Sequence, residues 1–147
     1  MPNTKSAVSP ADINDSPAGV NNFTVVAATV NGSGSQTANN VLLRAFFKMG
    51  IPVSGKNIFP SNIQGLPTWF HIRVSKDGYI GRRETAEVVV ALNRTTAAED
   101  IRNVATGGVV ILPEEWKLPQ DRGDITYYTL PIQQMAKDSG ANAELRP

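Results

Sequence analysis

The chain has 147 residues, which is enough for one domain with a hydrophobic core and too few for two of ordinary size. Its apolar fraction of 41% and charged fraction of 18% are typical of soluble globular proteins. No window approaches the roughly 20 apolar residues that a membrane-spanning helix needs, so the sequence predicts no membrane association.

The layout of charge says more than the net charge of +1. No Asp or Glu occurs from Ser16 to Lys76, whereas five basic residues lie there: Arg44, Lys48, Lys56, Arg73 and Lys76. We therefore expect the first half of the domain to attract anions. Nucleic acid is not an expected partner.

The chain has no cysteine and a single histidine, His71. It cannot form a disulfide, a thiolate nucleophile, a zinc-thiolate site or a cysteine-ligated iron–sulfur cluster. A catalytic triad or metal cluster would have to do without a second histidine. Any redox metal is expected on another chain.

Residues 1–22 are rich in Asn, Asp, Ser and Pro. They lack the apolar stretch of a signal peptide and the arginine pattern of a transit peptide. We expect a disordered polar tail on a cytoplasmic protein, followed by one domain over residues 23–147.

The domain is expected to open with a strand, a glycine turn and a helix. Phe23–Val30 is a run of β-branched and small apolar residues, typical of a strand buried on both faces. Asn31–Ser35 has turn chemistry, and the apolar residues between Ala38 and Met49 recur at helical spacing. Gly50, with Pro52 just beyond it, ends this helix.

The next segments predict a loop and a hairpin. Ile51–Phe59 is short, apolar and rich in turn residues, and we assign no strand to it; Pro60–Pro67 is expected to be an ordered loop. Trp69–Ser75 alternates, with Phe70, Ile72 and Val74 on one face. A turn at Lys76–Gly78 is expected to pair this strand with Tyr79–Ile80.

Buried strands and helices alternate in the rest of the chain. The expected elements are strands at Glu87–Leu92, Gly108–Leu112 and Ile125–Leu130 and helices at Thr95–Val104 and Gln133–Ser139. The sequence predicts a single α/β domain with an open, mostly parallel, Rossmann-like sheet that contains one antiparallel hairpin. A helical pattern begins near the C-terminus, so we expect a fragment of a longer polypeptide.

The glycine turn is the first candidate site, because backbone amides and the helix dipole can hold a phosphate between a strand and a helix. Its candidate cofactor-binding residues are Gly32, Ser33, Gly34, Ser35, Gln36 and Thr37. Thr37 replaces the third glycine of the dinucleotide fingerprint, and no acidic residue follows about 20 positions later, which disfavours NAD. A tight turn that binds nothing is an equal alternative.

The second candidate group combines the loop and one face of the following strand. The loop offers Ser61, Asn62, Gln64 and Gly65, which can orient a ligand but are poor at proton transfer. The strand face carries Trp69, His71 and Arg73, a pairing of aromatic and cation that is common at interfaces. The alternatives are a structural loop and a solvated strand face.

The stretch from Asn31 to Arg83, with Thr96–Asp100 and Gly140–Ala143 in the expected order, carries a resemblance to a known family. It closely resembles the gamma domain of 2-oxoacid:ferredoxin oxidoreductases, especially the large subunit in which gamma and alpha domains are fused. Gly32, Gly34, Gln36 and Thr37 match the family's phosphate-facing turn, although Ser35 and Thr37 stand where many relatives have glycine.

The resemblance implies an enzyme complex that oxidatively decarboxylates a 2-oxoacid, transfers the acyl group to coenzyme A and reduces ferredoxin. In the family, thiamine diphosphate with magnesium and an iron–sulfur cluster lie on the alpha domain and the beta subunit, while the gamma domain contributes coenzyme A binding and assembly. The loop sequence NIFPSNIQGLPTW looks most like that of enzymes acting on 2-oxoglutarate, with pyruvate as the runner-up. The implied catalytic and metal residues therefore lie outside this chain.

Two other readings remain open at the level of sequence. A free-standing nucleotide-binding oxidoreductase domain would bind NADH in preference to coenzyme A. A pure interaction domain would leave the glycine turn empty.

Overall fold

Six strands form one sheet in the order β2-β3-β1-β4-β5-β6 in the computed structural model, which describes residues 20–60 and 63–140. The strands are β1 Asn22–Val30, β2 Val53–Ile58, β3 Pro67–Ser75, β4 Ala86–Ala91, β5 Val104–Pro113 and β6 Thr126–Leu130. The helices are α1 Ser35–Lys48, α2 Ala97–Arg102 and α3 Ile132–Asp138, with a 3₁₀ turn, η2, at Glu114–Trp116. The predicted α/β class and mostly parallel sheet are confirmed.

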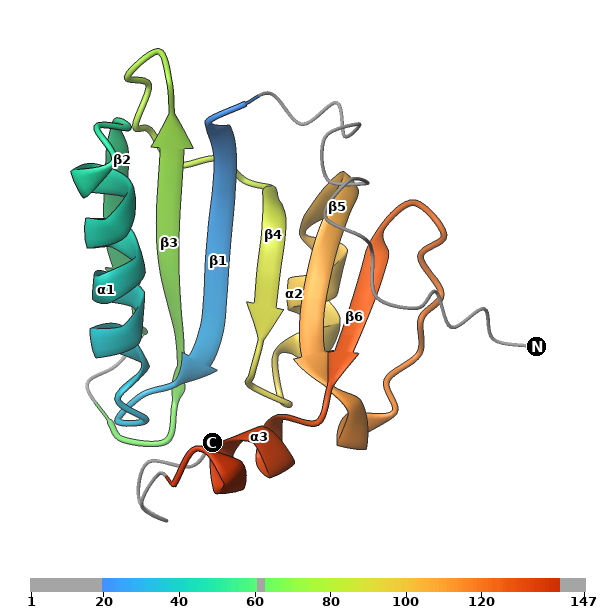
Figure 1. Ribbon diagram of the computed structural model, residues 1–147. Helices are drawn as coiled ribbons and strands as arrows, with labels where there is room; N and C mark the ends of the chain where they lie inside the picture. The colour runs from blue at the N-terminus through green and yellow to red at the C-terminus, as the bar shows by residue number, and fades with distance from the viewer. Residues whose placement is uncertain (1–19, 61–62, 141–147) are drawn as a thin grey trace.

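One strand, β3, runs against all the others (Figure 1). The pairs β1–β4, β4–β5 and β5–β6 are parallel, whereas β3 pairs antiparallel with both β1 and β2. The predicted hairpin partner, Tyr79–Ile80, was wrong. The turn before it does form, with Gly78 at φ +78°, but Tyr79 and Ile80 lie outside the sheet and are exposed.

The true antiparallel partner of β3 at the sheet edge is β2, to which the sequence analysis assigned no strand. The segment VSGKNI contains Gly, Lys and Asn and has no apolar run, so its local pattern does not indicate a strand. Pairing with β3 makes this segment a strand. An edge strand bonds to one neighbour and packs on the core with one face, so it does not require a local apolar run. Val53 packs on the core beneath α1.

Helices cover the two faces of the sheet unequally. Val26 and Ala27 are neighbours on β1 and therefore point to opposite faces. Val26 belongs to the core that α2 covers over β4 and β5, and Ala27 belongs to the core that α1 covers over β2 and β3. The core thus consists of two clusters separated by the sheet, each with one helix above it.

A glycine lies at each end of α1, as the sequence predicts. Gly34 is the N-cap at φ +77° and Gly50 follows the C-cap at φ +76°. Leu43 and Phe46 pack on the sheet, and the Phe46 ring meets Phe23 edge-on with centroids 5.8 Å apart. No residue of the helix is buried, so most of its apolar surface is open.

Two predictions concern the ends of the chain. The predicted tail lies outside the described residues as far as residue 19, and β1 already begins at Asn22. The expected C-terminal helical pattern lies at residues 141–147, also outside them. Within residues 20–60 and 63–140, no helix has the length and apolar character that crossing a bilayer requires.

We predict that Gly108→Ala destabilises the fold by about 1–3 kcal/mol, because overpacking against rigid atoms forces backbone movement. A Cβ at Gly108 would lie 2.7 Å from the Ala105 carbonyl oxygen and 2.8 Å from the Glu87 carbonyl oxygen. Gly123→Ala is the control, since a Cβ there meets nothing within 4 Å. Urea denaturation of both variants tests this, and equal midpoints would contradict it.

Candidate functional site

The carboxyl ends of β1 and β4 form the place where a ligand site is expected in this topology. From β1 the chain crosses through α1 to β2 on one side, and from β4 it crosses through α2 to β5 on the other (Figure 1). Such a reversal between adjacent parallel strands opens a crevice at their carboxyl ends, because the two connections diverge there. The glycine turn follows β1 directly into this crevice.

The turn exposes the backbone donors that begin α1. Gly32 and Gly34 adopt φ +87° and +77°, a region that glycine enters without steric cost. No side chain caps the helix, and its first turn holds no acidic residue. The N–H groups of Ser33 and Thr37 donate to the Val30 and Gly34 carbonyls, each at 3.1 Å. The N–H groups of Gly34, Ser35 and Gln36 and the positive end of the helix dipole are available to an anion.

The predicted ligand loop packs against the glycine turn through Asn31. The Asn31 N–H donates to the Leu66 carbonyl (2.8 Å), and the Gly65 N–H donates to the Asn31 carbonyl (3.0 Å). The Asn31 side-chain amide also donates to the Ile63 carbonyl (3.1 Å). Two candidate regions about 30 residues apart in sequence are thus joined at one edge of the sheet.

Gln64 closes the other side of the turn. A Cβ on Gly32 would lie 2.9 Å from Gln64 Cγ, so the side chain rests where only a glycine leaves room. Gln64 and Gly65 therefore lie at the predicted site. Ser61 and Asn62 lie outside the described residues.

Two cavities meet at this turn. The larger, of about 540 Å³, is mostly apolar and extends between α1 and the sheet, with Ala38, Leu42, Ile72 and Val90 among its walls. The smaller, of about 340 Å³, lies over Gly34, Gln36 and Thr37. The residues that line both are Thr29, Val30, Asn31, Gly32, Ser35, Asn39 and Phe70.

Two buried polar atoms at these cavities lack hydrogen-bond partners among the described residues: Ser33 Oγ and Asn39 Nδ2. Buried polar groups are normally paired, so unpaired groups beside a cavity fit a ligand that supplies the partner. Ser35 Oγ, by contrast, is paired with Thr29 Oγ1 at 2.7 Å. The arrangement can bind and orient a molecule with an anionic and an apolar part.

Five polar residues that line these cavities were not predicted as site residues: Thr29, Asn31, Asn39, Asn57 and Thr68. Asn39 carried a weak signal, since it lies one helical turn after Ser35 and so faces the same way. Thr68 and Asn57 carried none, because their partnership across β2 and β3, with Thr68 Oγ1 donating to Asn57 Oδ1 at 3.0 Å, depends on a strand that was not predicted.

The face with Trp69, His71 and Arg73 lies on the other side of the sheet, and Trp69 and Arg73 form hydrogen bonds within the domain instead of lying on a solvated strand face. Trp69 Nε1 donates to Asp100 Oδ1 at 2.8 Å and joins the core under α2. Arg73 is only 7% exposed and donates to the carbonyls of Phe23 (3.0 Å) and Val74. β3 is also interior to the sheet, so this face is not a free edge.

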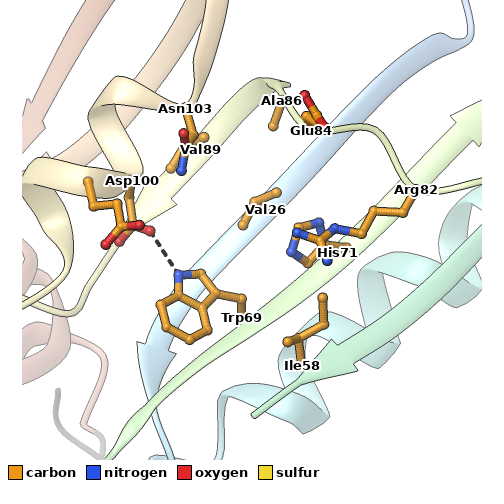
Figure 2. A pocket seen from close by; sticks show the side chains of 11 residues that line it. Val26, Ile58, Trp69, His71, Arg82, Glu84, Ala86, Val89, Asp100 and Asn103 are labelled. Carbon is orange, nitrogen blue, oxygen red and sulfur yellow. Dashed lines mark hydrogen bonds between the residues drawn. The ribbon is translucent and has the colours of Figure 1, made fainter. Parts of the chain in front are cut away.

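His71 alone of these three points into a cavity without a partner (Figure 2). Burial lowers the pKa of His71, and the nearby cations Arg82 and Lys56 lower it further. On the opposite wall, burial raises the pKa of Asp100, although hydrogen bonds from Thr96 and Trp69 favour its carboxylate. Among the described residues, no group of acidic, histidine or cysteine side chains is arranged to hold a metal ion.

A parallel α/β sheet with a glycine turn at its switch point belongs to the class of Rossmann-like ligand-binding domains. Residues 24–146 match the family described as pyruvate ferredoxin/flavodoxin oxidoreductase. Because this match covers most of the chain, the protein belongs to that family.

One curated relative is the alpha subunit of 2-oxoacid:ferredoxin oxidoreductase 2 from Aeropyrum pernix. It is 25% identical over 80 residues, which are 54% of this chain and 12% of the relative. This chain therefore spans about an eighth of the length of that relative.

Three solved structures share the fold. The 2-oxoglutarate:ferredoxin oxidoreductase of Magnetococcus marinus, determined with 2-oxoglutarate, coenzyme A and succinyl-CoA bound, has a TM-score of 0.73 at 18% identity over 82% of this chain and 22% of its own. A keto/oxoacid ferredoxin oxidoreductase gamma subunit from Geobacter sulfurreducens has a TM-score of 0.66 at 17% identity, over 84% and 69%. A pyruvate oxidoreductase subunit from Thermotoga maritima has a TM-score of 0.61 at 16% identity, over 80% and 66%.

We predict that Asp100→Asn removes a pH-dependent loss of stability. A carboxyl whose pKa is raised on folding favours the folded state when protonated, so wild-type stability should fall as pH rises from 3.8, the ordinary value, through the folded-state pKa. Asparagine has no such titration and keeps an oxygen for Trp69. The free energies of unfolding of wild type and Asp100→Asn should therefore diverge with rising pH, in favour of the variant.

Asp100→Ala is the companion variant. It leaves the Trp69 indole N–H unpaired and should cost about 1–3 kcal/mol at neutral pH, the penalty of an unsatisfied buried donor. Urea denaturation between about pH 4 and pH 8 measures all three proteins. Parallel curves for wild type and Asp100→Asn would mean that Asp100 titrates normally.

Proposed function

We propose that this chain is the gamma domain of a 2-oxoacid:ferredoxin oxidoreductase, and that it contributes coenzyme A binding and subunit assembly. The observation that carries the proposal is the uncapped glycine turn beside two cavities, in a chain of this family. The whole complex would oxidise a 2-oxoacid to an acyl-CoA and carbon dioxide while reducing ferredoxin.

Coenzyme A fits the residues at the turn. Its phosphates suit the free N–H groups of Gly34, Ser35 and Gln36, and its extended apolar arm suits the 540 Å³ cavity along α1. Ser33 Oγ and Asn39 Nδ2 would gain partners from its polar atoms. When bound, coenzyme A supplies the thiol that accepts the acyl group; the residues of this chain hold and orient it.

The remaining chemistry is assigned to an alpha domain and a beta subunit. A cysteine-ligated iron–sulfur cluster needs thiolates, which this chain lacks, and thiamine diphosphate with its magnesium has no evident site in the sequence. The similarity to a short segment of an alpha subunit and to part of a long oxidoreductase chain supports a gamma domain fused to an alpha domain.

The proposed substrate is 2-oxoglutarate, with pyruvate as the alternative. Support for 2-oxoglutarate comes from the resemblance of the loop NIFPSNIQGLPTW, which begins at Asn57 and ends at Trp69. The Magnetococcus marinus structure with 2-oxoglutarate bound has the same fold, but so does the pyruvate oxidoreductase subunit, so the fold does not favour either substrate.

The open surface of α1 supports the role in assembly. On α1, which has no buried residue, Val41 is 65% exposed and Phe47 73%, and Met49 at its C-cap is 70% exposed. Large exposed apolar side chains along one element are typical of a surface that another chain or domain covers. We assign this helix, rather than the face of Trp69 and Arg73, as the main contact with the rest of the complex.

We predict that the chain binds coenzyme A in preference to NADH, and that Gly34→Val weakens this binding. A branched side chain at Gly34 would occupy the open space from which a phosphate approaches the turn. The loss expected is about tenfold or more in affinity, equivalent to losing charge-assisted hydrogen bonds from the turn. Isothermal titration calorimetry measures it.

Gly50→Val is a matched control, because it shares the backbone strain of Gly34→Val without the site. Gly50 has φ +76° against +77°, and neither Cβ would meet an atom within 4 Å. Both variants should lose about 1–2 kcal/mol of stability, the cost of a left-handed conformation for a residue with a Cβ. Equal affinity of the two for coenzyme A would exclude the turn as its site, and preferential binding of NADH would favour a free-standing nucleotide-binding domain.

We also predict that this chain alone does not oxidise 2-oxoacids. With coenzyme A, 2-oxoglutarate or pyruvate, and a viologen dye as acceptor, the purified 147-residue chain should show no reduction of the dye. Addition of the alpha domain and the beta subunit should restore it. Reduction of the dye by the purified chain alone would contradict the assignment of the thiamine and cluster chemistry to other parts.

A further inference from the structure

A third cavity, of about 250 Å³, lies on the face of the sheet opposite α1 (Figure 2). It opens where α2 no longer covers the sheet, over β1 and β3. Its walls share no residue with the two cavities at the glycine turn. The walls are formed by Val26, Ile58, Trp69, His71, Arg82, Glu84, Ala86, Val89, Glu99, Asp100 and Asn103.

Basic groups gather on one side of this cavity: His71 and Arg82 line it, and Lys56 lies beside His71 without lining it. His71 lies directly opposite Lys56 in the antiparallel pairing of β3 with β2, so the two side chains stand on the same face. Arg82, from the connection between β3 and β4, extends its guanidinium toward the His71 ring (Figure 2). In residues 20–60 and 63–140, neither Lys56 nor Arg82 forms an ion pair; the pairs there are Arg83–Glu87 and Arg122–Asp124.

His71 has a buried ring nitrogen without a hydrogen-bond partner at this wall. Its Nδ1 is buried and has no partner among the described residues. The charges that act most on the ring are both positive, and together with burial they hold it in the neutral form. An anion in the cavity would reverse this balance, because it would pair with Nδ1–H and offset the charges of Arg82 and Lys56.

The acidic groups of the cavity do not fill this role. Asp100 accepts hydrogen bonds from Trp69 and from Thr96 Oγ1 (2.7 Å), so its oxygens are already used. Glu99 precedes it on α2 and also lines the cavity. Glu84 lies near Ala86, beyond the reach of an ion pair with Arg82 (Figure 2). Three carboxylates thus line the cavity, but within the described domain none of them is paired with Arg82 or Lys56.

The volume of the cavity and its apolar walls indicate which ligands would fit. The volume is below the roughly 300–1,000 Å³ typical of sites for drug-sized ligands, which excludes a nucleotide. Ile58, Val26 and Val89 provide apolar surface beside the basic wall. The fitting group is a carboxylate on a short apolar body, since a planar carboxylate can pair with guanidinium and imidazole together.

We propose that this cavity is a carboxylate-binding site in which Arg82 and His71 hold the anionic group and the apolar walls hold the body that carries it. The site is separate from the glycine turn and does not depend on coenzyme A binding. Two sources offer this chemistry: a small free organic acid, and the side chain of an Asp or Glu residue from another chain.

His71 is the only histidine of the chain, so its imidazole signals in an NMR titration need no assignment. The probes are benzoate and its uncharged analogue benzamide, with the full 147-residue chain. Benzoate should bind saturably, raise the pKa of His71 and bind more tightly at about pH 6 than at about pH 8, because binding favours the imidazolium form. Benzamide should do none of this.

Arg82→Gln should weaken benzoate binding by about tenfold, the effect of losing a charge-assisted pair. Arg83→Gln is the matched control: it removes the same charge one residue away, from a surface ion pair with Glu87 outside the cavity, and should leave binding unchanged. Equal binding by the two variants, equal binding of benzoate and benzamide, or an unchanged His71 titration would each overturn the proposal.

A second pair of probes identifies the source of the carboxylate. A blocked tripeptide with a central glutamate is compared with its glutamine counterpart in the same titration. If the glutamate peptide binds more tightly than benzoate, the site takes a side chain of a partner chain. If benzoate binds and the peptide does not, the site takes a small organic acid.

Discussion

β1 is held along its length by two neighbours that run in opposite directions, and the rest of the domain is arranged around this pairing. β3 bonds to one edge of β1 from Asn22 to Val30, and β4 bonds to the other from Val25 to Ala28. Because the connection after β1 leads toward β2 and the connection after β4 leads toward β5, the two connections diverge at the shared carboxyl end and leave a crevice there. The glycine turn and both of its cavities lie at this end.

The reversed strand β3 also connects the two sites. Its first residues enter the sheet directly after the loop that is bonded to Asn31, so the pairing with β1 holds that loop against the glycine turn. Its alternating side chains then serve opposite faces: Phe70 and Ile72 form the floor beneath α1, while Trp69 and His71 line the cavity beside α2. One strand thus provides a wall to the 540 Å³ cavity at the glycine turn and to the 250 Å³ cavity on the opposite face.

Helices cover only part of each face of the sheet, which is unusual for a mostly parallel sheet. Parallel sheets are normally buried on both faces, yet α1 spans only β2, β3 and β1 on one face, and α2 spans only β4 and β5 on the other. Within the described residues, Val88 and Val90 remain partly open on the α1 face, and α1 has no buried residue. An incompletely covered domain of this kind is suited to a role inside a larger assembly, which agrees with the proposed gamma domain.

The sequence by itself determined the buried strands β1, β4 and β5, the helix between Gly34 and Gly50, and the glycine turn, because each depends on a local apolar run or on a residue with positive φ. It also predicted the strand β6, but β6 lies at the edge of the sheet and none of its residues is buried. Only the tertiary structure decided the strand β2, the partners of β3 and the inward roles of Trp69 and Arg73. Those features depend on contacts between distant residues, such as Trp69 with Asp100 and Arg73 with Phe23, and alternation along a strand cannot reveal what lies opposite it. The proximity of Arg82 to His71 also depends on tertiary structure. It arises because the connection between β3 and β4 folds back over the face of β3 that carries His71.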